Sequence, residues 1–333
     1  MAKSVSLPFE MPLFATTQGA AAAPLAMTGH PTAHIQMLIQ TASLCCWRKF
    51  LKGHSTPLVS VFHIGIDTFS FMERYKVNCR HTKKYCLDII KQMLDEHYYV
   101  YYSFVDDYYL PGKSWYGTRH FNHDGIICGY DDNDNTLSIA AYDINWVFRL
   151  IRVPQDCFMM GLESSLDLKR YGDLTAYKIK GGTTVEINES EMLKHLQEYM
   201  DSSLEKYPPD QEGAVKGLAV HYYLATYIEK LMDGSIPHEK MDWRALRPVW
   251  EHKRCMLMRI RAVEDKNGWG HELSQRYAPV AEKANQIRIM YAMYHKNRNT
   301  RLLDKIRAGL IDLAKSDEEI LGEFINKLEE CTL

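Results

Sequence analysis

One segment, residues 121–143, constrains the fold more than any other part of the chain. It reads Phe-Asn-His-Asp-Gly-Ile-Ile-Cys-Gly-Tyr-Asp-Asp-Asn-Asp-Asn-Thr-Leu-Ser-Ile-Ala-Ala-Tyr-Asp, with a strand-like run on each side of residues 131–135. Asp and Asn favour turns because their side chains bond to nearby backbone and tolerate positive φ. The segment therefore predicts a β-hairpin, and strand character continues to about Val153.

The predicted hairpin brings two chemically active side chains together. If the turn is centred on Asn133, His123 lies directly opposite Asp143. Opposed side chains of an antiparallel pair have Cβ atoms about 4.5–5.5 Å apart, so the carboxylate can accept the imidazole N–H. That bond would fix the tautomer and leave the other ring nitrogen to take a proton from a nucleophile. A register shift of one residue would instead send the two side chains to opposite faces.

The remaining patterns divide the chain into a mixed first part and a helical second part. Apolar spacing predicts helices over residues 31–51 and 82–96, and the aromatic run at 98–105 predicts a strand. Beyond a capping-box-like start at Asn188, helical patterns continue to about residue 330. We expect an α+β fold with a domain over residues 1–165 that carries the hairpin, followed by a mainly helical domain over 166–333.

Composition narrows the classes of function. Forty Lys and Arg against 42 Asp and Glu give a formal charge of -2, which gives no support to nucleic-acid binding. No apolar stretch reaches the length of a membrane span, and the first residues do not form a secretory signal. The eight cysteines contain no CxxC pair, which is typical of reduced cytoplasmic thiols and not of a metal site. The acidic hairpin turn lacks the glycine and glutamate of an EF-hand loop.

The stretch His123-Asp-Gly-Ile-Ile-Cys-Gly-Tyr-Asp-Asp, with the strand that ends at Asp143, resembles the His–hairpin–Asp signature of papain-like cysteine peptidase folds. More narrowly, the chain resembles the butirosin biosynthesis protein H N-terminal family. The run Tyr98-Tyr-Val-Tyr-Tyr-Ser-Phe-Val-Asp-Asp-Tyr-Tyr-Leu-Pro carries this likeness further, and segments 191–202 and 244–261 extend it over most of residues 85–330. The resemblance implies a papain-like first domain with an antiparallel sheet and a central helix. It also implies acyl transfer from a carrier-protein thioester through a Cys–His–Asp arrangement, in nonribosomal peptide or polyketide pathways.

The nucleophile departs from that family pattern. A papain-like thiol sits at the start of the central helix, where the helix dipole and the histidine stabilise the thiolate. Here the expected start reads Thr28-Gly-His-Pro-Thr-Ala-His-Ile35 and has no cysteine. Cys45 and Cys46 would lie roughly 18–20 Å further along a helix of that length. Three alternatives stay open: Cys46 or Cys45 is the nucleophile, Thr32 or His34 takes a part, or Ala33 occupies the position and covalent catalysis is absent.

We therefore expect an acyltransferase or thioesterase-like enzyme with His123 as general base and Asp143 as its orienting carboxylate. The alternatives are a carrier-binding scaffold that has lost its nucleophile, and a cyclase that uses His123 without covalent catalysis. Asp107 and Tyr108, with Thr32 and His34, are expected to line the substrate site. An acyl or peptidyl carrier protein would bring its own phosphopantetheine, so we expect no intrinsic cofactor or metal. Arg298, Arg301 and Lys305 are the expected carrier-docking residues, because Arg and Lys pair well with phosphate, and a small molecule is the expected acceptor.

Overall fold

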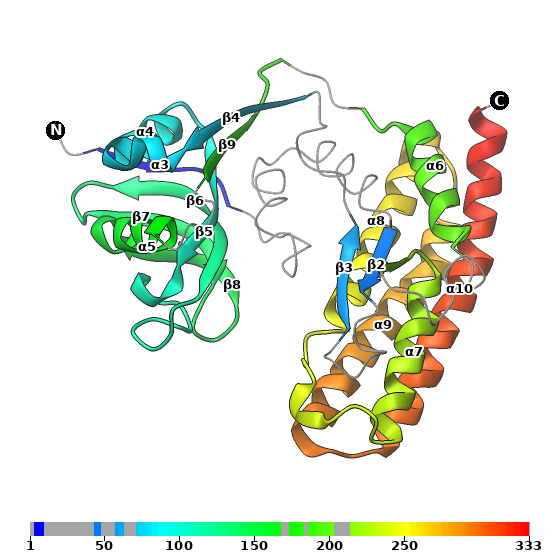
Figure 1. Cartoon of the computed structure of the whole chain (residues 1–333). Helices are drawn as coiled ribbons and strands as arrows, with labels where there is room; N and C mark the ends of the chain where they lie inside the picture. Colours follow the sequence, from blue (N-terminus) through cyan, green and yellow to red (C-terminus); the bar gives the residue numbers. More distant parts are fainter. Residues whose placement is uncertain are drawn as a thin grey trace. The chain divides into compact units, whose positions relative to one another are not determined.

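The computed structural model describes residues 3–9, 43–47, 57–62, 71–167, 173–182, 186–202 and 214–332. The chain forms two compact units, drawn in Figure 1. The sheet unit comprises residues 1–34 and 65–185, and the helical unit comprises residues 35–64 and 186–333. The boundary that we expected between residues 165 and 166 falls inside helix α5 (Gln155–Asp167). The sheet unit continues beyond this helix, because the chain then adds strand β9 (Asp173–Ile179) to the sheet.

The sheet unit combines an antiparallel sheet with helices. Its strands are β1 (Ser4–Ser6), β4 (Met72–Asn78), β5 (Tyr99–Asp106), β6 (Asn122–Asp131), β7 (Thr136–Tyr142), β8 (Phe148–Pro154) and β9 (Asp173–Ile179). Its helices are α3 (Cys79–Thr82), η3 (Lys83–Tyr85), α4 (Cys86–Asp95), η4 (Asp107–Tyr109) and α5 (Gln155–Asp167). The strands follow the order β4-β9-β5-β6-β7-β8, and β1 pairs with the far half of β6. The expected α+β class is therefore confirmed.

The hairpin predicted from residues 121–143 is present as β6 and β7. Ile126 lies opposite Ala140 and Ile127 opposite Ile139, which is the predicted register. A bulge between Ile127 and Gly129 then shifts the register by one residue toward the turn. In the turn, Asp131 Oδ1 accepts a hydrogen bond from the Asn133 N–H at 2.9 Å, the side-chain-to-backbone bond for which Asp is favoured.

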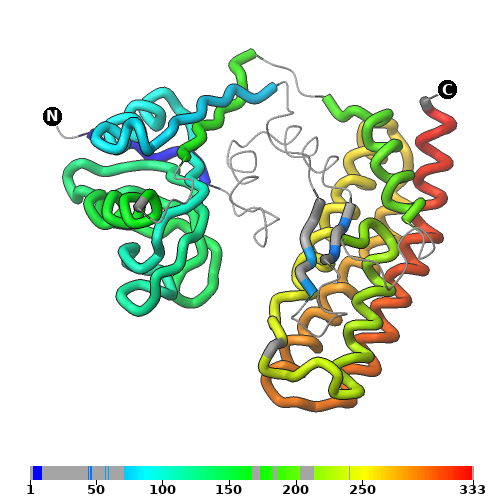
Figure 2. Tube along the Cα trace, viewed as in Figure 1, coloured from blue at the N-terminus to red at the C-terminus, as the bar shows by residue number. Residues whose placement is uncertain are grey.

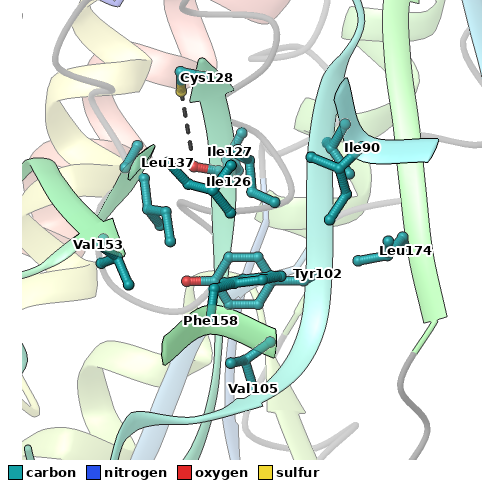
Figure 3. Packing of buried hydrophobic residues seen from close by; sticks show 14 of the residues in the cluster. Ile90, Tyr102, Val105, Ile126, Ile127, Cys128, Leu137, Val153, Phe158 and Leu174 are labelled. Atoms are coloured by element: carbon teal, nitrogen blue, oxygen red, sulfur yellow. Dashed lines mark hydrogen bonds between the residues drawn. The ribbon is translucent and has the colours of Figure 1, made fainter. Parts of the chain in front are cut away.

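The core of the sheet unit lies where α4 and α5 pack against the strands. Cys86, Ile90 and Leu94 follow one another at intervals of four residues and form the buried stripe of α4. On the strands, Ile126, Ile127, Leu137 and Val153 join the same buried cluster, as Figure 3 shows.

Helix α5 was not predicted from the sequence, because its apolar spacing is weak. Its Phe158 packs edge-on against the ring of Tyr102 from β5, with ring centroids 5.4 Å apart. This contact, also visible in Figure 3, fixes α5 against the strand that leads into the site described below.

The helical unit is built mainly from long helices. They are α6 (Glu189–Met200), α7 (Ala219–Met232), α8 (Arg247–Asn267), α9 (Glu272–Asn297) and α10 (Arg301–Thr332), and the short helix η5 (His238–Lys240) lies between α7 and α8 in the sequence. A small antiparallel sheet of β2 (Ser43–Trp47), β3 (Leu58–Phe62) and β10 (Ala214–Lys216) packs against α6, α7 and α8. In Figure 2, orange α9 and red α10 run side by side along most of their length. No described helix combines the length and the apolar character that crossing a membrane requires.

A single buried carboxylate links the helices of this unit. Asp317 on α10 accepts hydrogen bonds from Tyr199 of α6 at 2.5 Å and from Tyr277 of α9 at 2.7 Å. Lys253 of α8 forms an ion pair with the same carboxylate, and none of these side chains is exposed. A buried charge is tolerated when its ion pair and hydrogen bonds are complete, so this cluster fixes how the four helices pack.

The helix predicted over residues 31–51 is wrong where the structure describes it. Residues 43–47 form strand β2, in which Leu44, Cys46 and Trp47 pair with β3. The run Ser-Leu-Cys-Cys-Trp is short and apolar, and such runs do not distinguish a strand from a buried helix by spacing alone. Pairing with β3, the next strand, and with β10, which lies far along the sequence, decided the outcome.

Candidate active site

The candidate site begins where β5 ends, at Asp106. Its carboxylate Oδ1 accepts hydrogen bonds from the N–H groups of Tyr108 at 3.2 Å and Phe121 at 3.0 Å. The first bond caps the short helix η4, and the second ties down the end of the loop that returns to β6. Asp106 thus holds both ends of the connection between two neighbouring strands.

The other oxygen of Asp106 holds an imidazole. His120 Nδ1 lies 2.7 Å from Asp106 Oδ2, and Ser164 Oγ donates to the same oxygen at 2.8 Å. The Asp106 side chain is fully buried, whereas 59% of the His120 side chain is exposed. The bond to Nδ1 directs the proton of the neutral imidazole to that nitrogen, so Nε2 carries the available lone pair.

Close helix packing brings Ser164 to this carboxylate. A Cβ on Gly161 of α5 would lie 2.9 Å from the Asp106 carbonyl oxygen and 2.8 Å from Val105 Cγ1. Glycine is therefore required at this position for α5 to approach the end of β5. One helical turn later, Ser164 lies beside Asp106 and donates its hydroxyl hydrogen.

At Asp106, hydrogen bonds outweigh burial in setting the pKa of the carboxyl group. Burial alone would raise the pKa of this carboxyl, but bonds from His120, Ser164 and the two backbone N–H groups hold it below its ordinary value. Asp106 is thus ionised at neutral pH beside an exposed imidazole. This is the arrangement by which a carboxylate orients a histidine and stabilises its protonated form.

His123 lies near this pair but has different partners. It sits on β6 opposite Val105, and its Nδ1 is 3.0 Å from the Asp124 carbonyl oxygen and 3.2 Å from Asp124 Oδ1. Its ring stacks against Phe121 with centroids 5.7 Å apart. His123 therefore also has an anchored Nδ1, held by its own neighbour in sequence.

Asp143, the expected partner of His123, has another role in the structure. Its Oδ1 accepts from the N–H groups of Asn145 at 2.8 Å and Val147 at 2.9 Å, and its Oδ2 lies 2.6 Å from Arg149 Nη2. Burial alone would raise the pKa of Asp143, but these backbone bonds and Arg149 together hold it below the ordinary value.

The β6–β7 ladder ends before the expected pair is reached. Its last paired residues are Ile126 and Ala140, and beyond Tyr142 the chain folds into a tight turn stabilised by the Asp143 carboxylate. Among the described residues, the hydrogen-bond and ion-pair partners of Asp143 do not include His123. The predicted register therefore holds for Ile126 and Ile127 but not on the turn side of the bulge, and the predicted contact between the side chains of His123 and Asp143 is absent.

A second buried carboxylate, Asp107, lies beside the pair formed by Asp106 and His120. Its Oδ2 is 3.4 Å from Lys113 Nζ, and both side chains are buried. Burial raises the pKa of Asp107, and the charges of Lys113 and His123 partly offset that rise. Oδ1 of Asp107 is buried and has no hydrogen-bond partner among the described residues. Tyr108, the other expected substrate-binding residue here, stacks on His120 with centroids 4.3 Å apart.

Among the described residues, no cysteine sulfur is hydrogen-bonded to either imidazole. Cys46 lies in the helical unit on β2 with no exposed surface, and Cys45 lies on the same strand. The expected nucleophile thus belongs to a small sheet and not to the start of a central helix. Thr32 and His34 lie outside the described residues.

The sheet unit does contain a cysteine at a helix start, Cys86 of α4. Hydrogen bonding with Cys79 lowers its pKa to about 7, against the opposing effect of burial. Its side chain is nevertheless fully buried, as is that of Cys79. Cys128 is buried as well, and burial raises its pKa to about 12. No hydrogen bond joins a described cysteine to His120 or His123.

The basic residues proposed for docking lie in the helical unit. Arg298 ends α9 with φ of 58°, and Arg301 begins α10. Lys305 follows one turn later, and all three side chains are exposed. The structure therefore places them together at the α9–α10 connection. Within the described residues, no group of three or more His, Cys, Asp or Glu side chains is arranged to hold a metal ion.

The pair of His120 and Asp106 was missed by the sequence reasoning. The two residues are 14 positions apart and belong to a loop and a strand end, so neither a helical nor a strand period relates them. The register of the predicted hairpin selects His123, three residues later, because His123 lies in strand β6. Comparison with known proteins adds no further guide: no protein-family model matches the sequence, and no curated protein matches it.

Proposed function

We propose that the sheet unit catalyses hydrolysis or acyl transfer of a carrier-bound acyl or peptidyl thioester by general-base catalysis, with His120 as the base. The observation that carries this proposal is the exposed imidazole held through Nδ1 by a buried, ionised carboxylate at 2.7 Å. General bases of this kind contribute about 10²–10⁴-fold to rate.

The thioester is proposed as the substrate because of the sequence resemblance. Of the segments that resemble the butirosin biosynthesis protein H N-terminal family, residues 98–111 contain Asp106, and His120 lies in the loop between them and the resembling hairpin at 123–143. An antiparallel sheet with helices packed on it is compatible with the papain-like fold which that resemblance implies. The proposed setting is specialised-metabolite biosynthesis, with phosphopantetheine supplied by the carrier protein.

The proposed reaction proceeds without an enzyme-bound acyl group. His120 Nε2 takes a proton from the acceptor, which is water, an alcohol or an amine, as the acceptor oxygen or nitrogen attacks the thioester carbonyl carbon. The tetrahedral intermediate then collapses, the carbon–sulfur bond breaks, and the imidazolium returns the proton to the departing thiolate. Asp106 stabilises the imidazolium between these two steps. Cys79, Cys86 and Cys128 are buried, and burial together with the charge of Asp156 raises the pKa of the partly exposed Cys157, which supports this route over a covalent one.

A second candidate is a carrier-binding scaffold without catalysis. It is favoured by the absence of a described thiol at either imidazole and by the exposed group of Arg298, Arg301 and Lys305, which suits an acidic carrier or its phosphate. In this alternative the Asp106 carboxylate serves only to hold the loop before β6.

The test is incubation of the full chain with a panel of acyl-pantetheine and acyl-carrier thioesters, with thiol release and intact protein mass as readouts. We expect thiol release without a protein adduct, and a loss of about 10²–10⁴-fold in His120→Gln. His81→Gln, an exposed histidine of α3, is the matched control and should keep full activity. An acyl adduct on a cysteine would overturn the non-covalent route, and carrier binding without turnover would favour the scaffold.

A further inference from the structure

We infer that a strip of aromatic rings beside His120 binds the acyl chain of the substrate and selects that chain by its length. The strip consists of Trp146, Trp115, Phe121 and His123. The inference rests on the proposed function for the identity of the ligand, and it deepens that function by assigning the residues that determine specificity.

The four rings form a continuous series. Trp146 meets Trp115 edge-on with centroids 6.4 Å apart, and Trp115 lies 6.1 Å from Phe121. Phe121 in turn stacks on His123 at 5.7 Å. Each ring therefore contacts the next, and their surfaces join three segments of chain: the 143–147 turn, the loop before β6, and β6 itself.

Much of this apolar surface is open to solvent. Phe121 and Trp146 are 37% and 40% exposed, and Ile144 and Val147 beside Trp146 are 61% and 48% exposed. Contiguous exposed apolar surface is uncommon on a folded protein and marks a site of interaction. Arg119, whose guanidinium lies 5.2 Å from the Trp115 ring, provides a positive charge along the strip.

The backbone holds the strip in place at some energetic cost. Trp146 has φ of 59°, a left-handed conformation that bulky residues rarely adopt. The Asp143 turn imposes this conformation, and Ser114 Oγ fastens the neighbouring loop by donating to the Asp143 carbonyl oxygen at 3.1 Å. Strain of this type persists where the surroundings enforce it and clusters at functional sites.

Continuity with the proposed base identifies the occupant as the acyl chain. Phe121 donates its N–H to one oxygen of Asp106, while His120 is held by the other oxygen. The strip and the base are thus fixed to the same carboxylate. An elongated series of rings fits a linear chain, which gains about 0.8 kcal/mol for each methylene group that it buries. Nucleic-acid bases also stack on aromatic rings, but such sites need a basic groove, whereas here Arg149 is paired with Asp143 and Asp124 lies beside His123.

The test measures binding separately from turnover. The probes are S-alkyl pantetheine thioethers from butyl to dodecyl, which have no thioester to cleave, titrated by calorimetry against the full chain. We expect affinity to rise by up to about fourfold per methylene and then to level off once the chain passes the last ring. Trp115→Ala and Phe121→Ala should flatten this dependence, and Phe121→Ala keeps the backbone N–H that binds Asp106.

Trp243→Ala is the matched control, because Trp243 is an exposed tryptophan of the helical unit. Affinity that does not depend on chain length, or equal losses in Trp115→Ala and Trp243→Ala, would overturn the inference. So would tight binding of a single-stranded oligonucleotide that Trp115→Ala abolishes. His120→Gln should bind the thioethers normally. If His120→Gln also retained full turnover, the assignment of His120 as the base would be wrong, and the inference that the aromatic strip binds the acyl chain would be unaffected.

Discussion

In the sheet unit, the fully buried carboxylate of Asp106 holds the exposed imidazole of His120, with Asp106 Oδ2 and His120 Nδ1 2.7 Å apart. The same carboxylate also accepts from Ser164 and from two backbone N–H groups. It therefore orients a histidine and closes a loop, and these two roles can be separated by mutation.

Asp106→Asn tests both roles. The amide keeps the size of the side chain but removes the charge, so we expect a loss of about 2 kcal/mol in the free energy of unfolding. We also expect a loss of about 10²–10⁴-fold in thiol release, because the amide no longer stabilises the imidazolium. Asp143→Asn is the comparison: it should cost about 1 kcal/mol by weakening its turn and should leave the rate nearly unchanged. Equal rate losses in the two variants would restore Asp143 as the orienting carboxylate.

The buried carboxylate of the helical unit predicts a large effect on stability. Asp317→Asn leaves Lys253 in the interior without an opposite charge, so we expect a loss of about 3–5 kcal/mol, measured by chemical denaturation. Asp312→Asn on the same helix is the control. Its pair with Lys283 is exposed on both sides, and its loss should cost less than about 1 kcal/mol. Similar losses in the two variants would contradict the role assigned to the Asp317 cluster.

The burial of His221 leads us to predict how the free energy of unfolding changes with pH. Burial, followed by the charge of Lys253, lowers its pKa to about 3, although Asp317 opposes the shift. Because this folded-state pKa lies below the ordinary value of about 6.5, the unfolded chain binds the proton more tightly. The stability contributed by neutral His221 is complete above about pH 6.5 and falls toward pH 3, by up to about 1.4 kcal/mol per pH unit.

Denaturation curves at several values of pH between 7 and about 4 check this dependence, and the difference between the native protein and His221→Gln isolates the histidine from the carboxylates. The difference should shrink as the pH falls. A difference that stays constant with pH would show that His221 does not titrate in this way.

Tyr102 offers a test of a buried polar atom. Its hydroxyl is buried in the sheet unit and has no hydrogen-bond partner among the described residues. Tyr102→Phe should therefore leave the free energy of unfolding unchanged or raise it by up to about 1 kcal/mol. Tyr277→Phe is the contrast, because its hydroxyl donates to Asp317 at 2.7 Å, and it should cost about 1–3 kcal/mol. A marked destabilisation by Tyr102→Phe would mean that its hydroxyl has a partner in solution.

The sequence by itself determined the elements whose pattern is local. The β6–β7 hairpin follows from the turn residues at 131–135 and from the strand-like runs beside them. Helix α6 begins at the predicted cap, where Asn188 Oδ1 accepts from the Glu191 N–H at 3.1 Å. The helical character of the last third of the chain follows in the same way from its apolar spacing.

The tertiary structure alone decided which side chains meet. Strand β2 formed in place of a helix because β3 and the distant strand β10 pair with it. The register of the hairpin predicted that His123 would meet Asp143. The β6–β7 ladder ends three residues before this pair, and the Asp143 carboxylate instead accepts hydrogen bonds within the turn that follows β7. His120 and Asp106 come together across a loop whose path depends on the close approach of α5 at Gly161. Periodicity reports local backbone geometry, whereas contacts across a loop depend on packing between elements that are far apart in the sequence.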